Sequence, residues 1–198
     1  HERPTLDVKS FARPILVWDT ETAGLGKPGI CQLSYILYES ETVTEYDKIL
    51  RLPPGVRIAK QAFEIHGISQ ARSDAGAPAE PELRAFHALV DRLLTSTPRG
   101  VVLGHNISFD CRAFNFSLSE LGLDLTPLEA SSMLCTMSAS SKHSNLKTVN
   151  GRRKPFRLTE LYEHLFGASP EWARLHNALD DVRVTALCYK KGLYHGWW

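Results

Sequence analysis

The sequence has no long hydrophobic run and almost no net charge. A membrane-spanning helix needs about 20 consecutive apolar residues, and no run approaches that length, so we exclude a membrane protein. The 198 residues hold 23 Lys and Arg against 22 Asp and Glu, which gives a formal net charge of +1. With 43% hydrophobic residues, this balance excludes a disordered chain. We expect a single domain over residues 1–198, with its core at about 13–192.

Cysteine is scarce, and its spacing carries no metal or disulfide signature. None of the four residues forms a C-x-x-C pair: Cys31, Cys111, Cys135 and Cys188. All four stand in apolar surroundings, which indicates small buried hydrophobic residues. Reduced thiols then predict an intracellular, reducing compartment such as the cytoplasm or the nucleus. No signal segment opens the chain, and because it begins with His1 we expect it to be trimmed or excised from a longer one.

The hydrophobic pattern predicts an α/β fold. Strands are expected over 15–20, 30–39, 43–52, 101–103 and 132–136, and helices over 59–65, 82–94, 108–121, 158–166 and 178–191. Short connections favour antiparallel pairing of the first three strands, whereas the later strands, separated by helices, favour parallel crossovers. The expected architecture is a mixed sheet flanked by helices.

Two acids end an otherwise apolar strand. Asp19 and Glu21 close the first expected strand, and because strand side chains alternate, both point to one face. Neighbouring carboxylates repel each other and resist burial, and a bound cation would resolve both problems. The alternative is two solvated carboxylates at a strand end.

Asp110 lies on the apolar face of the helix expected over 108–121. At about 100° per residue, the stripe that contains it also holds Phe114, Leu118 and Leu121. An Asp on a core face is tolerated when it is paired or metal-bound, which favours a functional role. The alternatives are an acid favoured by the helix dipole and an acid paired with Arg112 or His105.

The last expected helix begins with two acids that differ in orientation. Asp181 lies about 100° from the centre of the apolar face and can reach a half-buried site, whereas Asp180, about 160° away, should point to water. Asn177 and Asp180 have the type and spacing of a capping box. His176 precedes the cap on a loop that can reach the same site as Asp181.

These residues form a candidate catalytic set: Asp19, Glu21, Asp110, Asp181 and His176. Carboxylates suit hard divalent ions, so we expect two Mg²⁺ or Mn²⁺ ions as cofactors. Two such ions about 3.5–4 Å apart can hold both oxygens of an in-line phosphoryl displacement. A neutral histidine can accept the proton of the attacking water.

The sequence resembles the DEDDh group of DnaQ-like 3′–5′ exonucleases, which include the proofreading exonucleases of replicative DNA polymerases. Residues 17–24 read V-W-D-T-E-T-A-G, 104–110 read G-H-N-I-S-F-D, and 176–181 read H-N-A-L-D-D. These segments are similar to the family's D-T-E-T-x-G, H-N-x-x-F-D and H-x-A-x-x-D motifs. Residues 63–68 resemble its H-G-I segment, and the one minor departure is Ala23 where Thr is frequent. The resemblance covers about 15–189 and implies a ribonuclease-H-like fold.

The resemblance also implies roles for single residues. The four acids Asp19, Glu21, Asp110 and Asp181 match the metal ligands, and His176 matches the general base. Thr22, His66 and Phe109 match positions near the terminal nucleotide. For Phe109 the alternative is core packing, and for His66 a polar residue near a helix C-terminus.

A basic stretch separates the last two motifs. Residues 130–159 contain no acid and six basic residues, which include Arg152, Arg153 and Lys154. We interpret the stretch as a long, mobile flap that contacts a phosphate backbone without reading bases. A solvated loop that offsets the acidic site is the alternative.

The expected function is metal-dependent 3′–5′ exonuclease activity on single-stranded or frayed 3′ ends, with release of nucleoside 5′-monophosphates and with DNA favoured over RNA. A polymerase or a larger polypeptide is a further expected partner. An RNA 3′-trimming enzyme and a catalytically silent scaffold of the same fold are the alternatives.

Overall fold

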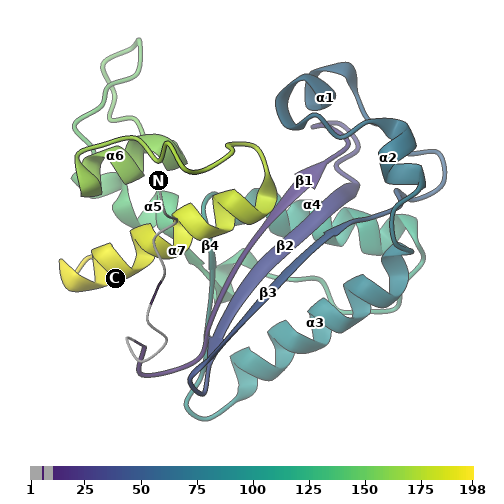
Figure 1. The fold of residues 1–198 in the computed structure, drawn as a ribbon, viewed down its shortest axis with the longest axis horizontal. Helices are drawn as coiled ribbons and strands as arrows, with labels where there is room; N and C mark the ends of the chain where they lie inside the picture. Colours follow the sequence, from purple (N-terminus) through teal and green to yellow (C-terminus); the bar gives the residue numbers. More distant parts are fainter. Residues whose placement is uncertain (1–5, 7–10) are drawn as a thin grey trace.

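The computed structural model describes residue 6 and residues 11–198 (Figure 1). The strands are β1 Ile15–Thr22, β2 Ile30–Glu39, β3 Thr42–Ile49, β4 Val101–Gly104 and β5 Leu134–Cys135. The helices are α1 Lys60–His66, α2 Gln70–Asp74, α3 Ala79–Thr95, α4 Ile107–Glu120, α5 Thr136–Ser140, α6 Leu158–Phe166 and α7 Ala178–Tyr194. Two 3₁₀ turns, η2 Ala130–Ser132 and η3 Ser141–His143, flank β5 and α5. Within the described ranges, no helix combines the length and the apolar character that a bilayer crossing requires.

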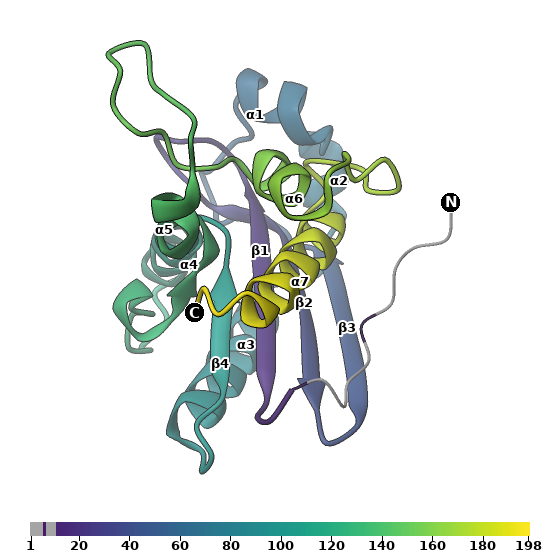
Figure 2. The same ribbon diagram turned by 90° about the vertical axis from the view of Figure 1, so that its left-hand side faces the viewer.

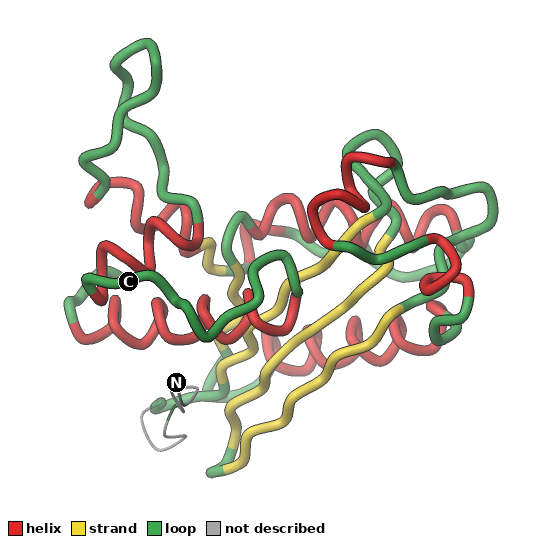
Figure 3. The backbone as a smooth tube through the Cα atoms, turned by 45° about the horizontal axis from the view of Figure 1, so that its top comes forward, coloured by secondary structure: helices red, strands yellow, loops and turns green. Residues whose placement is uncertain are grey.

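The five strands form one mixed sheet in the order β3-β2-β1-β4-β5. β1 pairs antiparallel with β2, and β2 with β3, whereas β1–β4 and β4–β5 are parallel. This topology confirms the predicted fold class. The apolar run that begins β1 lies in the middle of the sheet, where a strand is covered on both faces (Figure 3).

Helices cover both faces of the sheet, and the alternation along β1 decides what each face buries. Figure 2 shows α7 in front of the sheet and α3 behind it. Leu16 and Trp18 pack behind, with Phe86 of α3 and Phe114 of α4. Residues of β1, β2, β4 and α7 fill the front: Ile15, Val17, Ile36, Tyr38, Leu103, Val182, Ala186 and Tyr189. The next odd positions of β1 are Asp19 and Glu21, so the front face turns acidic where the strand ends.

Several elements differ from the prediction, and three of the differences have a physical reason in the structure. β3 ends at Ile49 rather than at 52, because Leu50 leaves the ladder to bridge Ala77. The fifth strand has two residues, since η2 precedes it and α5 begins at Thr136. The five-residue helix α2, capped by the Ser69 hydroxyl, was not predicted, because one turn is too short to show a hydrophobic period.

The cysteines follow the prediction with one exception. Cys31, Cys111 and Cys188 are buried, whereas Cys135 is half-buried. Cys135 ends β5, the edge strand of the sheet, and so lacks a further strand to cover it.

Candidate active site

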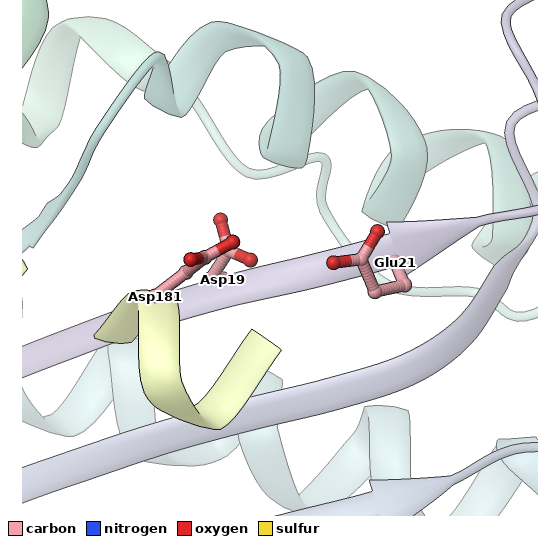
Figure 4. A group of neighbouring side chains, drawn as sticks. All are labelled: Asp19, Glu21 and Asp181. Carbon is pink, nitrogen blue, oxygen red and sulfur yellow. The ribbon is translucent and has the colours of Figure 1, made fainter. Parts of the chain in front are cut away.

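Three carboxylates meet at the end of β1. Ligand oxygens of Asp19, Glu21 and Asp181 all lie within 4.8 Å of one another. Asp19 and Glu21 are two residues apart on β1 and face α7, and Asp181 stands in the first turn of α7. Figure 4 shows the carboxylate of Asp181 beside that of Asp19, with Glu21 further along the strand. The structure therefore brings together acids that lie about 160 residues apart in sequence.

Asp110 reaches the site from the opposite side of the sheet. It is 2% exposed, and its Oδ1 accepts hydrogen bonds from the backbone N–H and the hydroxyl of Thr20, at 3.0 and 2.7 Å. The pairing of β1 with β4 ends at Val17, so the Asp110 carboxylate takes the place of a strand partner for the Thr20 amide. Asp110 lies outside the three-acid group, but its charge helps to raise the pKa of both Asp19 and Glu21.

The partners expected as alternatives for Asp110 are engaged elsewhere. The guanidinium of Arg112 lies over the ring of Phe109, 5.3 Å from its centroid. His105 bonds the Thr136 hydroxyl at 2.9 Å and the Phe156 carbonyl at 3.0 Å. Burial lowers the pKa of His105 to about 4, so His105 is neutral and cannot act as a counter-ion.

Burial and mutual repulsion raise the pKa of every acid in the cluster. Desolvation is the main cause for all four, and the charges of neighbouring acids add to it. The pKa of Glu21 rises to about 9, those of Asp110 and Asp181 rise to about 7, and that of Asp19 rises well above its usual value. Four ionised carboxylates are therefore unfavourable here without a cation.

The donor set fits a hard divalent cation. Asp181 Oδ1 is buried and has no hydrogen-bond partner, so an acceptor is left unsatisfied beside two further carboxylates. Such an acceptor is costly unless it binds a proton or a metal. An all-oxygen set of carboxylates favours Mg²⁺, Mn²⁺ or Ca²⁺ over softer metals.

The raised pKa values predict how the stability of the metal-free protein depends on pH. Between about pH 4 and pH 9 the folded acids hold more protons than the unfolded chain, so the free energy of unfolding should fall as pH rises. Urea denaturation at pH 5, 7 and 9 with a chelator measures this trend. Added Mn²⁺ should restore stability at pH 9, because a cation that binds only the folded state favours it. A metal-free protein that gains stability over this pH range would refute the assignment.

His176 stands in a turn that enters α7. The backbone N–H of Asn177 donates to the Arg174 carbonyl at 3.2 Å, and His176 has a left-handed φ of 60°. This conformation costs a non-glycine residue about 1–3 kcal/mol, so the surrounding structure must hold it. His176 is exposed. The turn thus places residue 176 directly before the first turn of α7, which carries Asp181.

The prediction for Asp180 was wrong. Asp180 is 6% exposed, and its carboxylate accepts from the Arg174 N–H and from the Arg183 guanidinium, both at 2.9 Å. The periodicity argument took the helix alone and could not see the turn that folds back over it. Half of the expected capping box is present, because the Asn177 side chain accepts from the Asp180 N–H.

The comparison with known families decides the relationship. The model of the RNase T exonuclease family matches residues 16–189. The chain belongs to this exonuclease family. It is accordingly a hydrolase with an exonuclease domain, and its resemblance to DEDDh, DnaQ-like enzymes is confirmed. No curated protein sequence matches the chain.

Solved structures of exonucleases share the fold. Exonuclease X in complex with 5′ overhanging duplex DNA is 22% identical, with a TM-score of 0.63 and 93% of each chain covered. The nuclease domain of 3′hExo, a DEDDh family member bound to rAMP, is 19% identical, with a TM-score of 0.66 and 92% of each chain covered. E. coli Exonuclease I in complex with a dA16 oligonucleotide is 21% identical, with a TM-score of 0.63 over 92% of this chain and 41% of that one. These likenesses show the ribonuclease-H-like exonuclease fold.

A cavity of about 740 Å³ adjoins Glu21 in this exonuclease. Thr22, His66 and Phe109 all line it, and Phe109 is half-exposed rather than packed in the core. His66 uses both ring nitrogens within the protein, because Nδ1 accepts from the Ile68 N–H and Nε2 bonds the Thr22 carbonyl, both at 3.0 Å. Its ring therefore fixes the end of β1 to the segment after α1 and offers a face to the cavity.

Two exposed apolar residues of the cavity were missed by the sequence reasoning. Leu25 and Ile65 line the same cavity and are 78% and 57% exposed. Leu25 follows directly on the first motif, between Gly24 and Gly26. An apolar residue in a glycine-rich turn has no core to join, and that signal could have identified it.

Part of the basic stretch forms a hairpin. We call residues 144–157 the basic hairpin. An antiparallel β-bridge joins Lys147 and Arg153, and the chain turns at Gly151, which has a φ of 73°. The Ser144 hydroxyl bonds the Lys154 carbonyl at 2.6 Å and closes the base. Figures 1 and 2 show that the basic hairpin rises at the same end of the molecule as α1. The stretch before it contains α5 and η3, so it is not one long loop.

The three predicted contact residues differ in their surroundings. Arg152 is exposed near the tip. Arg153 donates to the Lys142 carbonyl at 2.8 Å, and Lys154 forms an ion pair with Glu160 at 2.6 Å. Arg152 can therefore contact a ligand directly, whereas Arg153 and Lys154 also stabilise the hairpin through these contacts.

Proposed function

We propose that the protein is a metal-dependent 3′–5′ exonuclease that hydrolyses phosphodiester bonds at the 3′ end of DNA and releases nucleoside 5′-monophosphates. The observation that carries the proposal is the meeting of Asp19, Glu21 and Asp181 within 4.8 Å, beside the buried Asp110. Such a crowded anionic cluster is unfavourable unless it holds cations. The family relationship supplies the reaction class, exonucleolytic hydrolysis.

The residues divide the work of hydrolysis. Asp19, Glu21, Asp110 and Asp181 hold two divalent cations, Mg²⁺ or Mn²⁺, which when bound stabilise charge on the attacking and leaving oxygens. Thr20 orients Asp110 through its N–H and its hydroxyl. His176 accepts the proton of the attacking water, as an imidazole can near neutral pH.

The cavity beside Glu21 supports binding of the terminal nucleotide. The ring of Phe109 suits stacking against a base, and Leu25 and Ile65 add apolar contacts. The scissile phosphate would then lie at the cations that the adjoining acids would hold. Leu25, Ile65 and Phe109 form no hydrogen bonds with a base edge, so contacts with them do not distinguish one base from another.

The substrate is tested directly by matched DNA and RNA strands of one sequence, labelled at the 5′ end. Stepwise shortening from the 3′ end with Mg²⁺ or Mn²⁺, abolished by a chelator, is expected for DNA. Faster shortening of the RNA strand would favour the trimming alternative. Structures that share the fold are known with duplex DNA and with rAMP, so both arms are needed. Binding without hydrolysis would indicate a silent scaffold.

The basic hairpin should contribute to substrate binding and not to the chemical step. Changing Arg152, Arg153 and Lys154 together to Ala should raise KM and flatten its salt dependence. Each phosphate contact on a single strand contributes about −0.7 to the slope of the logarithm of the binding constant against the logarithm of the salt concentration. The maximal rate should change little, since the acid cluster and His176 are untouched. Steady-state rates on short and long strands between 50 and about 200 mM salt measure both effects.

A matched control removes three basic charges elsewhere, from the exposed Arg84 and Arg99 and the half-buried Lys190. This control variant should keep KM and the salt slope near those of the wild type. In the hairpin variant, KM should rise less for dinucleotides than for long strands. An unchanged KM and slope in the hairpin variant would show that the hairpin is only solvated.

A further inference from the structure

The turn that carries His176 is held at both ends by α7. The Asn177 carbonyl accepts from the Asp181 N–H at 3.0 Å, and the Asn177 side chain accepts from the Asp180 N–H at 3.3 Å. At the other end, the Arg174 N–H donates to Asp180 Oδ2 at 2.9 Å. The left-handed His176 lies between these two anchors. The Arg174 anchor is a single bond, and it depends on the Asp180 carboxylate.

Asp180 is itself fixed by an arginine that reaches the edge of the sheet. Arg183 Nη1 bonds Asp180 Oδ1 at 2.9 Å, while Nη2 and Nε bond the two oxygens of Glu45 on β3 at 2.7 and 3.3 Å. The arginine side chain is 19% exposed, and that of Asp180 is 8% exposed. A planar guanidinium between two carboxylates holds both in fixed orientation.

These contacts cross three elements that no sequence motif connects. Glu45 belongs to β3, Asp180 and Arg183 belong to α7, and Arg174 precedes the helix. Asp180 stands beside Asp181 in sequence, but its carboxylate is turned to the Arg174 N–H and Arg183, away from any role as a ligand.

We propose that Asp180 is a positioning residue for hydrolysis: held by the Arg183–Glu45 ion pair, it fixes the turn that places His176 at the acid cluster. The proposal rests on the function of His176 proposed above. We call the chain of contacts from Glu45 through Arg183 and Asp180 to the Arg174 N–H the link. Loss of the link lets the turn leave the left-handed conformation, and His176 then spends less time at the position of the attacking water. Binding of the nucleic acid is unaffected, because the cavity beside Glu21 and the basic hairpin share no residue with the link.

The test compares Asp180→Ala, Asp180→Asn and Arg183→Met with the wild type. Asp180→Ala and Arg183→Met should lower kcat by about 10–100-fold with KM within about threefold, since a small misplacement of a catalytic group has this effect. Asp180→Asn should restore most of kcat, because its carbonyl oxygen still accepts from the Arg174 N–H. Thermal melting with Mn²⁺ shows that each variant is folded.

The chain offers a matched control in a second strand-to-helix ion pair. Arg92 of α3 bonds both oxygens of Glu39 on β2 at 2.8 and 3.0 Å, remote from His176. Arg92→Met should keep the wild-type kcat. An equal loss of kcat in Arg92→Met, or wild-type kcat in folded Asp180→Ala, would overturn the proposal. Glu45→Gln, at a more exposed position, should give an intermediate loss.

Hydrogen exchange separates this proposal from the proposed function. Amides of residues 168–177 should exchange faster in Asp180→Ala and Arg183→Met than in the wild type, and Asp180→Asn should restore protection. This measurement needs no substrate, so it tests the link even if the wild type hydrolyses neither DNA nor RNA. Unchanged exchange in the folded variants would overturn the link, whereas altered exchange without hydrolysis in the wild type would overturn only the function.

Discussion

Replacing Asp19 by Ala is expected to abolish hydrolysis while the protein stays folded. Asp19 belongs to the three-acid group and is the acid on which most neighbouring charges act, so its loss removes a ligand from the centre of the site. Turnover on a labelled DNA strand with Mg²⁺ should fall by more than about 10³-fold, beyond the effect of a single stabilising donor. Without metal, the melting temperature should rise, because one of four mutually repelling acids is gone.

Replacing Asp110 should affect the activity of the enzyme as replacing Asp19 does, but it should affect the stability of the protein differently. Asp110→Ala should also abolish turnover, but it leaves the Thr20 N–H and hydroxyl without their acceptor. Any stabilisation from lost repulsion is then offset, so Asp110→Asn, which keeps an acceptor, is the better variant for melting experiments. Asp91→Ala, an exposed acid of α3, serves as the control for both. Near-normal turnover in Asp19→Ala or Asp110→Asn would refute the site.

Replacing His176 by Ala is expected to lower turnover by about 10²–10⁴-fold, the usual contribution of a general base. The rise of the rate towards neutral pH should disappear, because the group that accepts the proton is missing. Binding of Mn²⁺, followed by calorimetry or by the melting temperature, should persist, since the carboxylates remain.

The outcome for metal affinity decides the role of His176. If Mn²⁺ binding collapses in His176→Ala, the histidine is a ligand, and the base must be another group. His195→Ala removes another exposed histidine, beyond the C-terminal end of α7, and should leave the pH–rate profile unchanged.

The sequence by itself determined the fold class and the face of the sheet to which its acids point. The side-chain period of a strand is fixed by the backbone, so Asp19 and Glu21 had to share a face wherever β1 lay. The same reasoning placed Asp110 on the buried face of α4, where it is 2% exposed. Local periodicity is sufficient for such statements, because it depends on residues only a few positions apart.

The tertiary structure decided how the acids are held and what the hairpin and His66 contact. Thr20 binds Asp110 because β4 stops short of it, and Asp180 is buried because a turn folds back over α7. Both facts depend on segments far apart in sequence, which no period within a single helix or strand encodes. The shape of the basic hairpin is set by the β-bridge between Lys147 and Arg153 and by the hydrogen bond of the Ser144 hydroxyl, neither of which follows from the basic composition of the stretch. Sequence patterns report which side of an element is apolar, whereas the partner of each polar group is set by what the fold brings against it.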